Sequence, residues 1–233
     1  MELKKINSLV ELFYKKYEEK TLDESKKKEE FFLSSLKNKD LTDTLSGPYT
    51  YSWENIHEKI NILSNYLKKI ISKGNRCILL SENRPEWLIS DIAIMNAGGV
   101  TVPLFTTYSE KDYQYIIKDC EPTVCIVSNI EQFKKIKNYI TEKTILISID
   151  EFDEKIEFFE YIFLNAKTGL KNLTKSFVPY NDNLRRNDLA CIIYTSGTTG
   201  NPKGVMLSHG GILSNCEGAQ EILKSLIKKD PPV

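Results

Sequence analysis

The sequence predicts an α/β fold in which a mostly parallel β-sheet is flanked by helices. The first observation is that short apolar segments alternate, between residues 76 and 149, with helical patterns. This alternation is typical of βαβ units. The second is that segments such as RCILL at Arg76–Leu80 are apolar without alternation, so both faces of the sheet should be covered. The third is that 41% hydrophobic and 27% charged residues, in a chain of 233, suffice for a sizeable core.

Residues 1–47 are predicted to form a charged, mainly helical N-terminal extension. Apolar residues recur there at the spacing of one helical face, at Leu3, Ile6, Val10, Phe13 and Tyr17. Residues 46–48 (SGP) are typical of a turn. We therefore expect the body of the protein to occupy residues 48–233.

The body is expected to begin with a short extended piece at residues 49–51. A helix capped by Ser52 follows, with an apolar face that reaches Ile70 before Gly74 closes it. Further strands are expected at residues 76–80, 100–104, 123–127, 144–149, 189–194 and 205–208. Further helices are expected at residues 85–95, 109–120, 131–140, 157–170 and 211–226, and Ser109 with Asp112 resembles a capping box.

The charge balance and the apolar runs exclude several classes of protein. Lys plus Arg equals Asp plus Glu, at 32 each, so the net charge is zero. Nucleic-acid-binding proteins usually show a basic excess, which disfavours that class. The N-terminus lacks the apolar core of a signal peptide, and no apolar run approaches the roughly 18 residues of a membrane span. We expect a cytoplasmic protein with no transmembrane segment; peripheral membrane contact and the oligomeric state stay open.

The cysteines and histidines give no metal site. The five cysteines are odd in number and contain no C-x-x-C pair, which fits small buried side chains in a reducing compartment. They are Cys77, Cys120, Cys125, Cys191 and Cys216. The two histidines, His57 and His209, are not near a cysteine pair, so no metal ligands are identified.

Residues 194–204, YTSGTTGNPKG, have the composition of a phosphate-binding loop. Seven of the ten residues 195–204 are Thr, Ser or Gly, and they directly follow an apolar strand. Glycines let backbone N–H groups approach phosphate oxygens, while hydroxyls and a lysine add donors and positive charge. The candidate ATP phosphate-binding residues are Thr195, Ser196, Gly197, Thr198, Thr199, Gly200 and Lys203.

Two better-known nucleotide loops do not fit this segment. A Walker A loop requires G-x-x-x-x-G-K-[ST]. Counted from Gly197, Pro202 replaces the second glycine of that motif and Gly204 replaces its Ser or Thr. The dinucleotide pattern G-x-G-x-x-G is also absent. A flexible Ser/Thr/Gly linker is the remaining alternative, but such linkers rarely follow a buried strand directly or end in Pro-Lys-Gly.

The run YTSGTTGNPKGVMLSH, residues 194–209, resembles the loop of the adenylate-forming superfamily, which includes acyl-CoA synthetases, luciferases and peptide-synthetase adenylation domains. Residues 83–104 resemble the first helix and strand of that family, and residues 49–53 (YTYSW) resemble its entry segment. The resemblance covers residues 48–215 in the right order. Within the family, SENRPEWLISDIAIMNAGGVTVPLF is most similar to bacterial long-chain fatty acid–CoA ligases.

The resemblance implies that the chain is the first part of the large N-terminal domain of an AMP-forming acid–CoA ligase. Such an enzyme activates a carboxylic acid, here a long-chain fatty acid, with Mg²⁺-ATP to give acyl-AMP and pyrophosphate. Coenzyme A, the co-substrate, then displaces AMP. By resemblance, residues 195–200 and Lys203 hold the β- and γ-phosphates that leave as pyrophosphate.

The resemblance also implies that much of the active site lies downstream of the loop. The adenine, ribose and magnesium contacts, the acyl pocket and the C-terminal domain with its catalytic lysine follow the loop in that family, whereas 30 residues follow Lys203 here. We therefore expect the catalytic residues beyond Val233, the C-terminal domain to be absent and the chain alone to be inactive. A non-catalytic remnant with at most weak nucleotide binding is the alternative.

Three smaller candidates have simpler interpretations. For His209 a packing or capping role is favoured over contact with substrate, and His57 is expected on the surface. Glu82, Asn83 and Arg84 follow the end of a strand, where α/β proteins often place ligand groups. A turn followed by a helix cap is the interpretation that we favour for these three residues.

Overall fold

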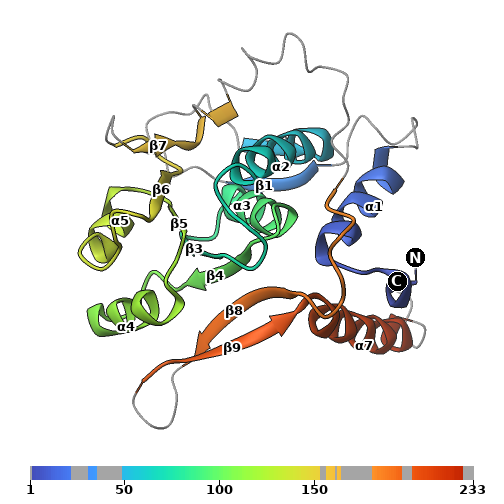
Figure 1. The fold of residues 1–233 in the computed structure, drawn as a ribbon. Helices are drawn as coiled ribbons and strands as arrows, with labels where there is room; N and C mark the ends of the chain where they lie inside the picture. The colour runs from blue at the N-terminus through green and yellow to red at the C-terminus, as the bar shows by residue number, and fades with distance from the viewer. Residues whose placement is uncertain are drawn as a thin grey trace.

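The computed structural model describes residues 2–21, 31–35, 49–152, 156–160, 162–163, 180–195 and 201–227 (Figure 1). The helices in these ranges are η1 (Leu3–Lys5), α1 (Leu9–Thr21), α2 (Trp53–Leu67), α3 (Pro85–Asn96), α4 (Glu110–Cys120), α5 (Ile130–Ile136) and α7 (His209–Ile227). The strands are β1 (Phe31–Ser35), β2 (Tyr49–Ser52), β3 (Arg76–Leu80), β4 (Val100–Leu104), β5 (Val124–Val127), β6 (Ile145–Ser148), β7 (Glu157–Phe158), β8 (Leu189–Thr195) and β9 (Lys203–Ser208).

A seven-stranded sheet in the order β7-β6-β5-β3-β4-β8-β9 forms the centre of the molecule (Figure 1). Each neighbouring pair from β7 to β8 is parallel, and β9 runs antiparallel to β8 as the second strand of a hairpin. The predicted α/β class and the mostly parallel sheet are therefore confirmed. Because the strands are parallel, the residues that follow β3, β4, β5, β6 and β8 meet at one edge of the sheet.

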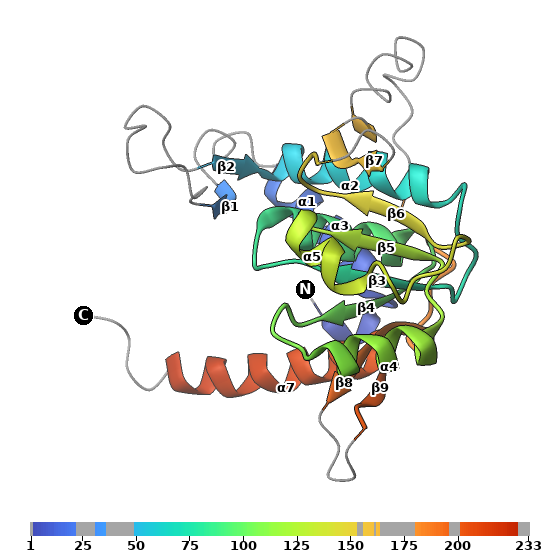
Figure 2. The same cartoon turned by 90° about the vertical axis from the view of Figure 1, so that its left-hand side faces the viewer.

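Helices cover both faces of the central strands, which explains why β3, β4 and β5 are largely apolar (Figure 2). On one face, α1, α2 and α3 enclose a core that includes Leu63 and Ile89. On the other face, α4 and α5 enclose a second core that includes Ile116. Leu79 and Leu80 are neighbours on β3 but belong to different cores. The two-residue period of a strand places them on opposite faces.

Local sequence signals set most of the element boundaries. β3 and β4 have the predicted bounds. The Ser52 hydroxyl accepts a hydrogen bond from the backbone N–H of Asn55 at 3.2 Å, which caps α2. The predicted capping box at the start of α4 also forms, with reciprocal bonds between Ser109 and Asp112.

Two predicted helix ends were wrong. α2 ends at Leu67. There the backbone N–H of Ile70 donates a hydrogen bond to the Leu67 carbonyl at 2.9 Å, which tightens the chain into a turn. Gly74, at φ +84°, therefore lies in the turn that precedes β3 and does not close the helix. α5 ends at Ile136, four residues earlier than expected.

The predicted helix at residues 157–170 begins instead as a strand. Glu157 and Phe158 form β7 and pair with Ile147 and Ser148 of β6, which adds an edge strand to the sheet. Residues 159–160 and 162–163 are helical, and Phe159 contributes to the core beneath α2 and α3. The rest of the predicted helix, residues 161 and 164–170, lies outside the described residues.

Segments of the N-terminal extension contact the body of the protein. Val10, Phe13 and Tyr14 of α1 belong to the same core as α2 and α3. β1 pairs antiparallel with β2, so residues 31–35 join the strand that precedes α2. These contacts join residues 1–47 to residues 48–233. The division of the chain at residue 47 stays a prediction.

Candidate phosphate-binding hairpin

The β8–β9 hairpin carries the glycine-rich loop. Its register pairs Tyr194 with Gly204 and Thr195 with Lys203, so the first and last of the predicted phosphate-binding residues lie opposite each other. The predicted residues between them are outside the described residues; they are Ser196, Gly197, Thr198, Thr199 and Gly200. The structure thus defines the root of the loop, at the carboxyl end of β8.

Two residues from the α4 region hold the root of the loop in place. The Tyr108 hydroxyl donates a hydrogen bond to the backbone carbonyl of Tyr194 at 2.7 Å, and the Tyr194 hydroxyl donates to the Asp119 carboxylate at 2.5 Å. Tyr194 is buried. Burial, together with the hydrogen bond to Asp119, raises the pKa of Tyr194 well above its usual value, so its phenol keeps its proton. The end of β8 is therefore fixed against α4.

The side chain of Tyr194 explains the glycine that follows Lys203. Tyr194 and Gly204 are cross-strand partners, so a side chain at position 204 would share a face with the Tyr194 ring. A Cβ added at Gly204 would lie 2.9 Å from Ile192 Cγ2 and 3.1 Å from Tyr194 Cζ. Glycine at this position therefore avoids a close contact within the hairpin.

We expect Gly204→Ala to lower the free energy of unfolding by about 1 kcal/mol, because Ile192 and Tyr194 must shift to make room. Urea denaturation measures this change. Gly218→Ala is the matched control, because a Cβ there meets no atom within 4 Å. Alanine should stabilise α7 at that position by roughly 0.5–1 kcal/mol. Equal stability of the two variants would rule out the packing role of Gly204.

Lys203 is exposed at the exit of the loop. In the part of the chain that the structure describes, no carboxylate forms an ion pair with it. Thr195, its partner across the hairpin, is also exposed. A hydroxyl and an ammonium group on opposite sides of the loop suit an anionic ligand that needs both donors and charge neutralisation.

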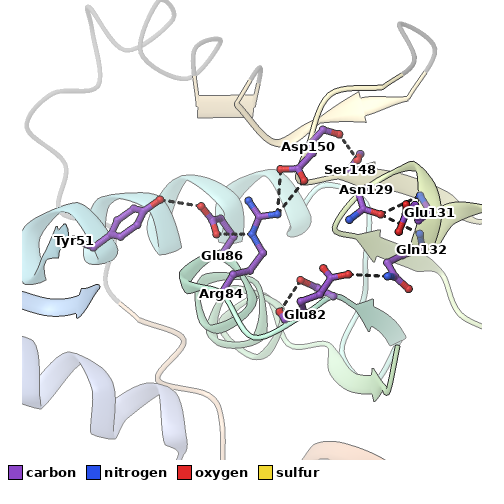
Figure 3. A network of polar contacts seen from close by, with 10 residues as sticks. Tyr51, Glu82, Arg84, Glu86, Asn129, Glu131, Gln132, Ser148 and Asp150 are labelled. Carbon is purple, nitrogen blue, oxygen red and sulfur yellow. Dashed lines mark hydrogen bonds and ion pairs between the residues drawn. The ribbon is translucent and has the colours of Figure 1, made fainter. Parts of the chain in front are cut away.

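A polar cluster lies at the carboxyl ends of β3 and β6 (Figure 3). The Arg84 guanidinium donates to Glu86 at 2.8 Å and to both carboxylate oxygens of Asp150 at 3.1 Å. The Tyr51 hydroxyl donates to Glu86 at 2.9 Å. Burial raises the pKa of Glu86, but the hydrogen bonds and the positive charge of Arg84 outweigh burial and hold that pKa below its usual value. These groups satisfy one another and connect β2, α3 and β6.

The residues singled out after β3 have structural partners. Arg84 occupies the N-cap position of α3, as expected, but its side chain makes no capping bond and forms the ion pairs instead. Glu82 accepts a hydrogen bond from the Gln132 side chain at 2.7 Å, which connects β3 to α5. Asn129 precedes α5 and caps it with its side-chain oxygen. The cluster therefore stabilises the sheet edge and leaves the hairpin as the candidate site.

The two histidines are buried. The prediction of a surface position for His57 was wrong, because α1 covers it and Tyr17 stacks on its ring at 3.9 Å between centroids. The packing role of His209 is confirmed: its ring is buried, and Nδ1 accepts a hydrogen bond from the backbone of Leu9 at 3.3 Å. Burial lowers the pKa of each ring to about 4, so both imidazoles are neutral at pH 7.

Sequence reasoning missed the residues that support the hairpin from α4. Tyr108 follows β4 at the same sheet edge as the loop, and that position is the signal that could have identified it. Asp119 lies in the last turn of α4 and has no local signal, because only the packing of α4 beside β8 brings it to Tyr194.

A hydroxyl- and glycine-rich hairpin at the carboxyl edge of a parallel sheet is the arrangement of a nucleotide- or phosphate-binding α/β protein. Comparison with known protein families gives the family itself. The model of the AMP-binding enzymes matches residues 32–230, and this chain belongs to that family. The curated relatives include long-chain-fatty-acid–CoA ligases of vertebrates.

Three known proteins illustrate the likeness. The fatty acyl-CoA synthetase A of Dictyostelium discoideum is 32% identical over 202 residues, which are 82% of this chain and 29% of that protein. VinN, solved with 3-methylaspartate, shares the fold with a TM-score of 0.66 at 17% identity, over 94% of this chain and 52% of VinN. ATP-bound MatB from Rhodopseudomonas palustris has a TM-score of 0.56 at 27% identity, over 72% of this chain and 31% of MatB. The chain thus spans less than a third of the synthetase and about half of VinN.

Neither a metal cluster nor a membrane-spanning helix occurs in the described ranges. No group of three or more His, Cys, Asp or Glu side chains there is arranged to hold a metal ion. No helix in these ranges combines the length and the apolar character needed to cross a bilayer. All five cysteines are free thiols. Cys77, Cys120 and Cys125 are buried, as predicted, and Cys191 is half-buried, but the prediction of burial was wrong for Cys216, which is exposed on α7.

Proposed function

We propose that this chain supplies the pyrophosphate-binding part of an AMP-forming acid–CoA ligase. In that reaction a carboxylate attacks the α-phosphate of ATP to give acyl-AMP and pyrophosphate, and the thiol of coenzyme A then displaces AMP. The observation that carries the proposal is the register of the β8–β9 hairpin, with Thr195 opposite Lys203 at the carboxyl edge of the sheet. Membership in the AMP-binding enzyme family supports the adenylation chemistry.

The proposed role of the loop is to bind the β- and γ-phosphates of ATP. Backbone N–H groups and hydroxyls donate to the phosphate oxygens, while the Lys203 ammonium neutralises charge. Negative charge grows on the departing pyrophosphate, so donors that are fixed before the reaction lower its barrier. Mg²⁺, bound with ATP, supplies further neutralisation. The residues proposed for this role are Thr195, Ser196, Gly197, Thr198, Thr199, Gly200 and Lys203.

The proposed acid is a long-chain fatty acid, and the proposed location is the cytoplasm. Support for the acid comes from the relatives, among them the fatty acyl-CoA synthetase of Dictyostelium and a long chain acyl-CoA synthetase of Arabidopsis thaliana. One relative of similar identity, gramicidin S synthase 1 of Brevibacillus brevis, is not named as a fatty acid–CoA ligase. The adenylation step is therefore better supported than the identity of the acid.

We expect the chain alone to give no exchange of labelled pyrophosphate into ATP with any of a panel of fatty acids. The physical reason is that the proposed loop binds only the leaving group, while this chain spans 29% of its fatty acyl-CoA synthetase relative. That relative, assayed in parallel, is the positive control. Exchange by this chain above the enzyme-free blank would show that a whole active site is present.

A further inference from the structure

The chain contains two histidines, and both contact the same helix, α1. His209 lies at the start of α1, where its Nδ1 accepts the backbone N–H of Leu9 at 3.3 Å. His57 lies against the rings of Tyr14 and Tyr17, further along the helix. Both imidazoles are buried. Histidine has an ordinary pKa of about 6.5, so mild acid can charge the groups on which α1 is docked.

The hydrogen bond from Leu9 requires a neutral His209. Leu9 is the first residue of α1, and its N–H is one of those that have no acceptor within the helix. Nδ1 of His209 supplies this acceptor, so the single proton of the neutral ring is on Nε2. A second proton would occupy Nδ1 and set two N–H groups against each other. It would also place a positive charge at the positive end of the helix dipole.

A chain of hydrogen bonds likewise requires a neutral His57. The amide nitrogen of Asn96 donates to the Tyr14 hydroxyl at 3.2 Å, and that hydroxyl in turn donates to Asn61 Oδ1. The NH₂ group of Asn61 is thereby directed to His57, where it lies 3.1 Å from Nε2 and 3.4 Å from Nδ1. A protonated imidazole carries donors on both nitrogens, so it could not accept this bond.

The charged groups around the two rings do not compensate for burial. Burial lowers the pKa of His209 to about 4; the Asp188 carboxylate acts in the opposite direction, and Lys73 adds to the lowering. Burial also lowers the pKa of His57 to about 4, against the attraction of the Glu54 carboxylate. Both rings therefore resist protonation for as long as α1 covers them.

The other titratable groups of α1 at these contacts keep their charge state between pH 7 and 5. Burial raises the pKa of Glu11, but hydrogen bonds with Lys15 and Asn7 outweigh burial and hold that pKa below its usual value. Burial raises the pKa of Tyr14 and of Tyr17, so both phenols stay neutral. The change of charge in this pH range thus falls on the two histidines.

We propose that α1 is an acid-released helix, which two neutral histidines hold on the body and which leaves it when they are protonated. An exposed histidine binds a proton below about pH 6.5, whereas these docked rings bind one only below about pH 4. The released state binds more protons, so its population rises as the pH falls. From pH 7 to 5 the opening equilibrium should increase about 20-fold for each histidine that release exposes. Release requires neither ATP nor pyrophosphate, so it is independent of the proposed function.

Hydrogen–deuterium exchange of the α1 amides at pH 7 and pH 5, read by mass spectrometry, tests the proposal. After correction for the intrinsic exchange rate, protection of residues 12–17 should fall by about tenfold or more at pH 5, while β3 and β5 keep theirs. His209→Asn combined with His57→Gln is the matched variant. Each amide offers an oxygen acceptor in place of a ring nitrogen and takes up no proton, so its α1 should be equally protected at both pH values.

NMR of the histidine ring nitrogens in the unmodified chain gives a second readout that needs no variant. At pH 7 both rings should be neutral, and His209 should carry its proton on Nε2. A proton on Nδ1 of His209, or a charged ring at pH 7, would overturn the proposal. Undiminished protection of α1 at pH 5 would also overturn it, as would an equal loss of protection in the unmodified chain and the double variant.

Discussion

Gly210→Ala is expected to lower the free energy of unfolding by about 3 kcal/mol, as measured by urea denaturation. A Cβ at this position would lie 2.9 Å from both Cβ and the carbonyl oxygen of Arg186. The carbonyl is part of the backbone and cannot rotate away, and it accepts the Gly210 N–H at 2.7 Å. Arg186 also donates to the carbonyls of Leu3 and Ile6, so its displacement would loosen the N-terminal segment from α7.

Gly211→Ala is the control, because the neighbouring glycine has room. A Cβ at Gly211 meets Ser208 Oγ at 3.5 Å, an ordinary contact distance. Alanine in a helix is more favourable than glycine by roughly 0.5–1 kcal/mol. We therefore expect Gly211→Ala to be neutral or slightly stabilising. If both substitutions change stability equally, close packing of Arg186 on the start of α7 is not the reason for glycine at position 210.

Asn96→Leu should lower the free energy of unfolding by about 3 kcal/mol. Asn96 is fully buried at the end of α3, and its amide donates to Tyr14 at 3.2 Å and to Ser64 at 3.1 Å. Its oxygen accepts the backbone N–H of Asn181 at 2.8 Å. Leucine has a similar size but leaves the Asn181 N–H without its acceptor and removes the donor to both hydroxyls, which costs more than the apolar contact returns.

Asn138→Leu provides the comparison, since Asn138 is exposed beyond the end of α5. Its replacement should change stability by no more than about 0.5 kcal/mol. Urea denaturation of both variants gives the difference. A loss of less than about 1 kcal/mol for Asn96→Leu would mean that the buried amide does not connect α1, α2 and α3 in the way the hydrogen bonds indicate.

The central part of the fold is predictable because its signals are local. The strand Arg76–Leu80, the helix opened by Pro85 and the strand Val100–Leu104 all follow from apolar runs and their flanking residues. β7, the docking of α1 and the burial of His57 depend on contacts between distant segments. A charged helix such as α1 gives little sign, in sequence, of the helices that it will cover.

The same limit applies to the candidate site. Composition and spacing predict a phosphate-binding loop from Thr195 to Lys203, because its glycines, hydroxyls and single lysine are visible in the sequence. Gly204 and Asp119 are explained only by the structure. The glycine makes room for the Tyr194 ring, and the carboxylate accepts the Tyr194 hydroxyl. Packing within the hairpin determines the first and packing between β8 and α4 determines the second, and no local pattern encodes either.

Binding of Mg²⁺-pyrophosphate, measured by isothermal titration calorimetry, tests most directly whether the hairpin is a phosphate site. The chain should bind this probe, and Lys203→Met should weaken binding about 10- to 100-fold, since a charge-assisted hydrogen bond contributes about 1.5–3 kcal/mol. Lys143→Met, at an exposed lysine before β6, should leave the affinity unchanged. Absence of binding, or equal affinities for the Lys203 and Lys143 variants, would contradict the account.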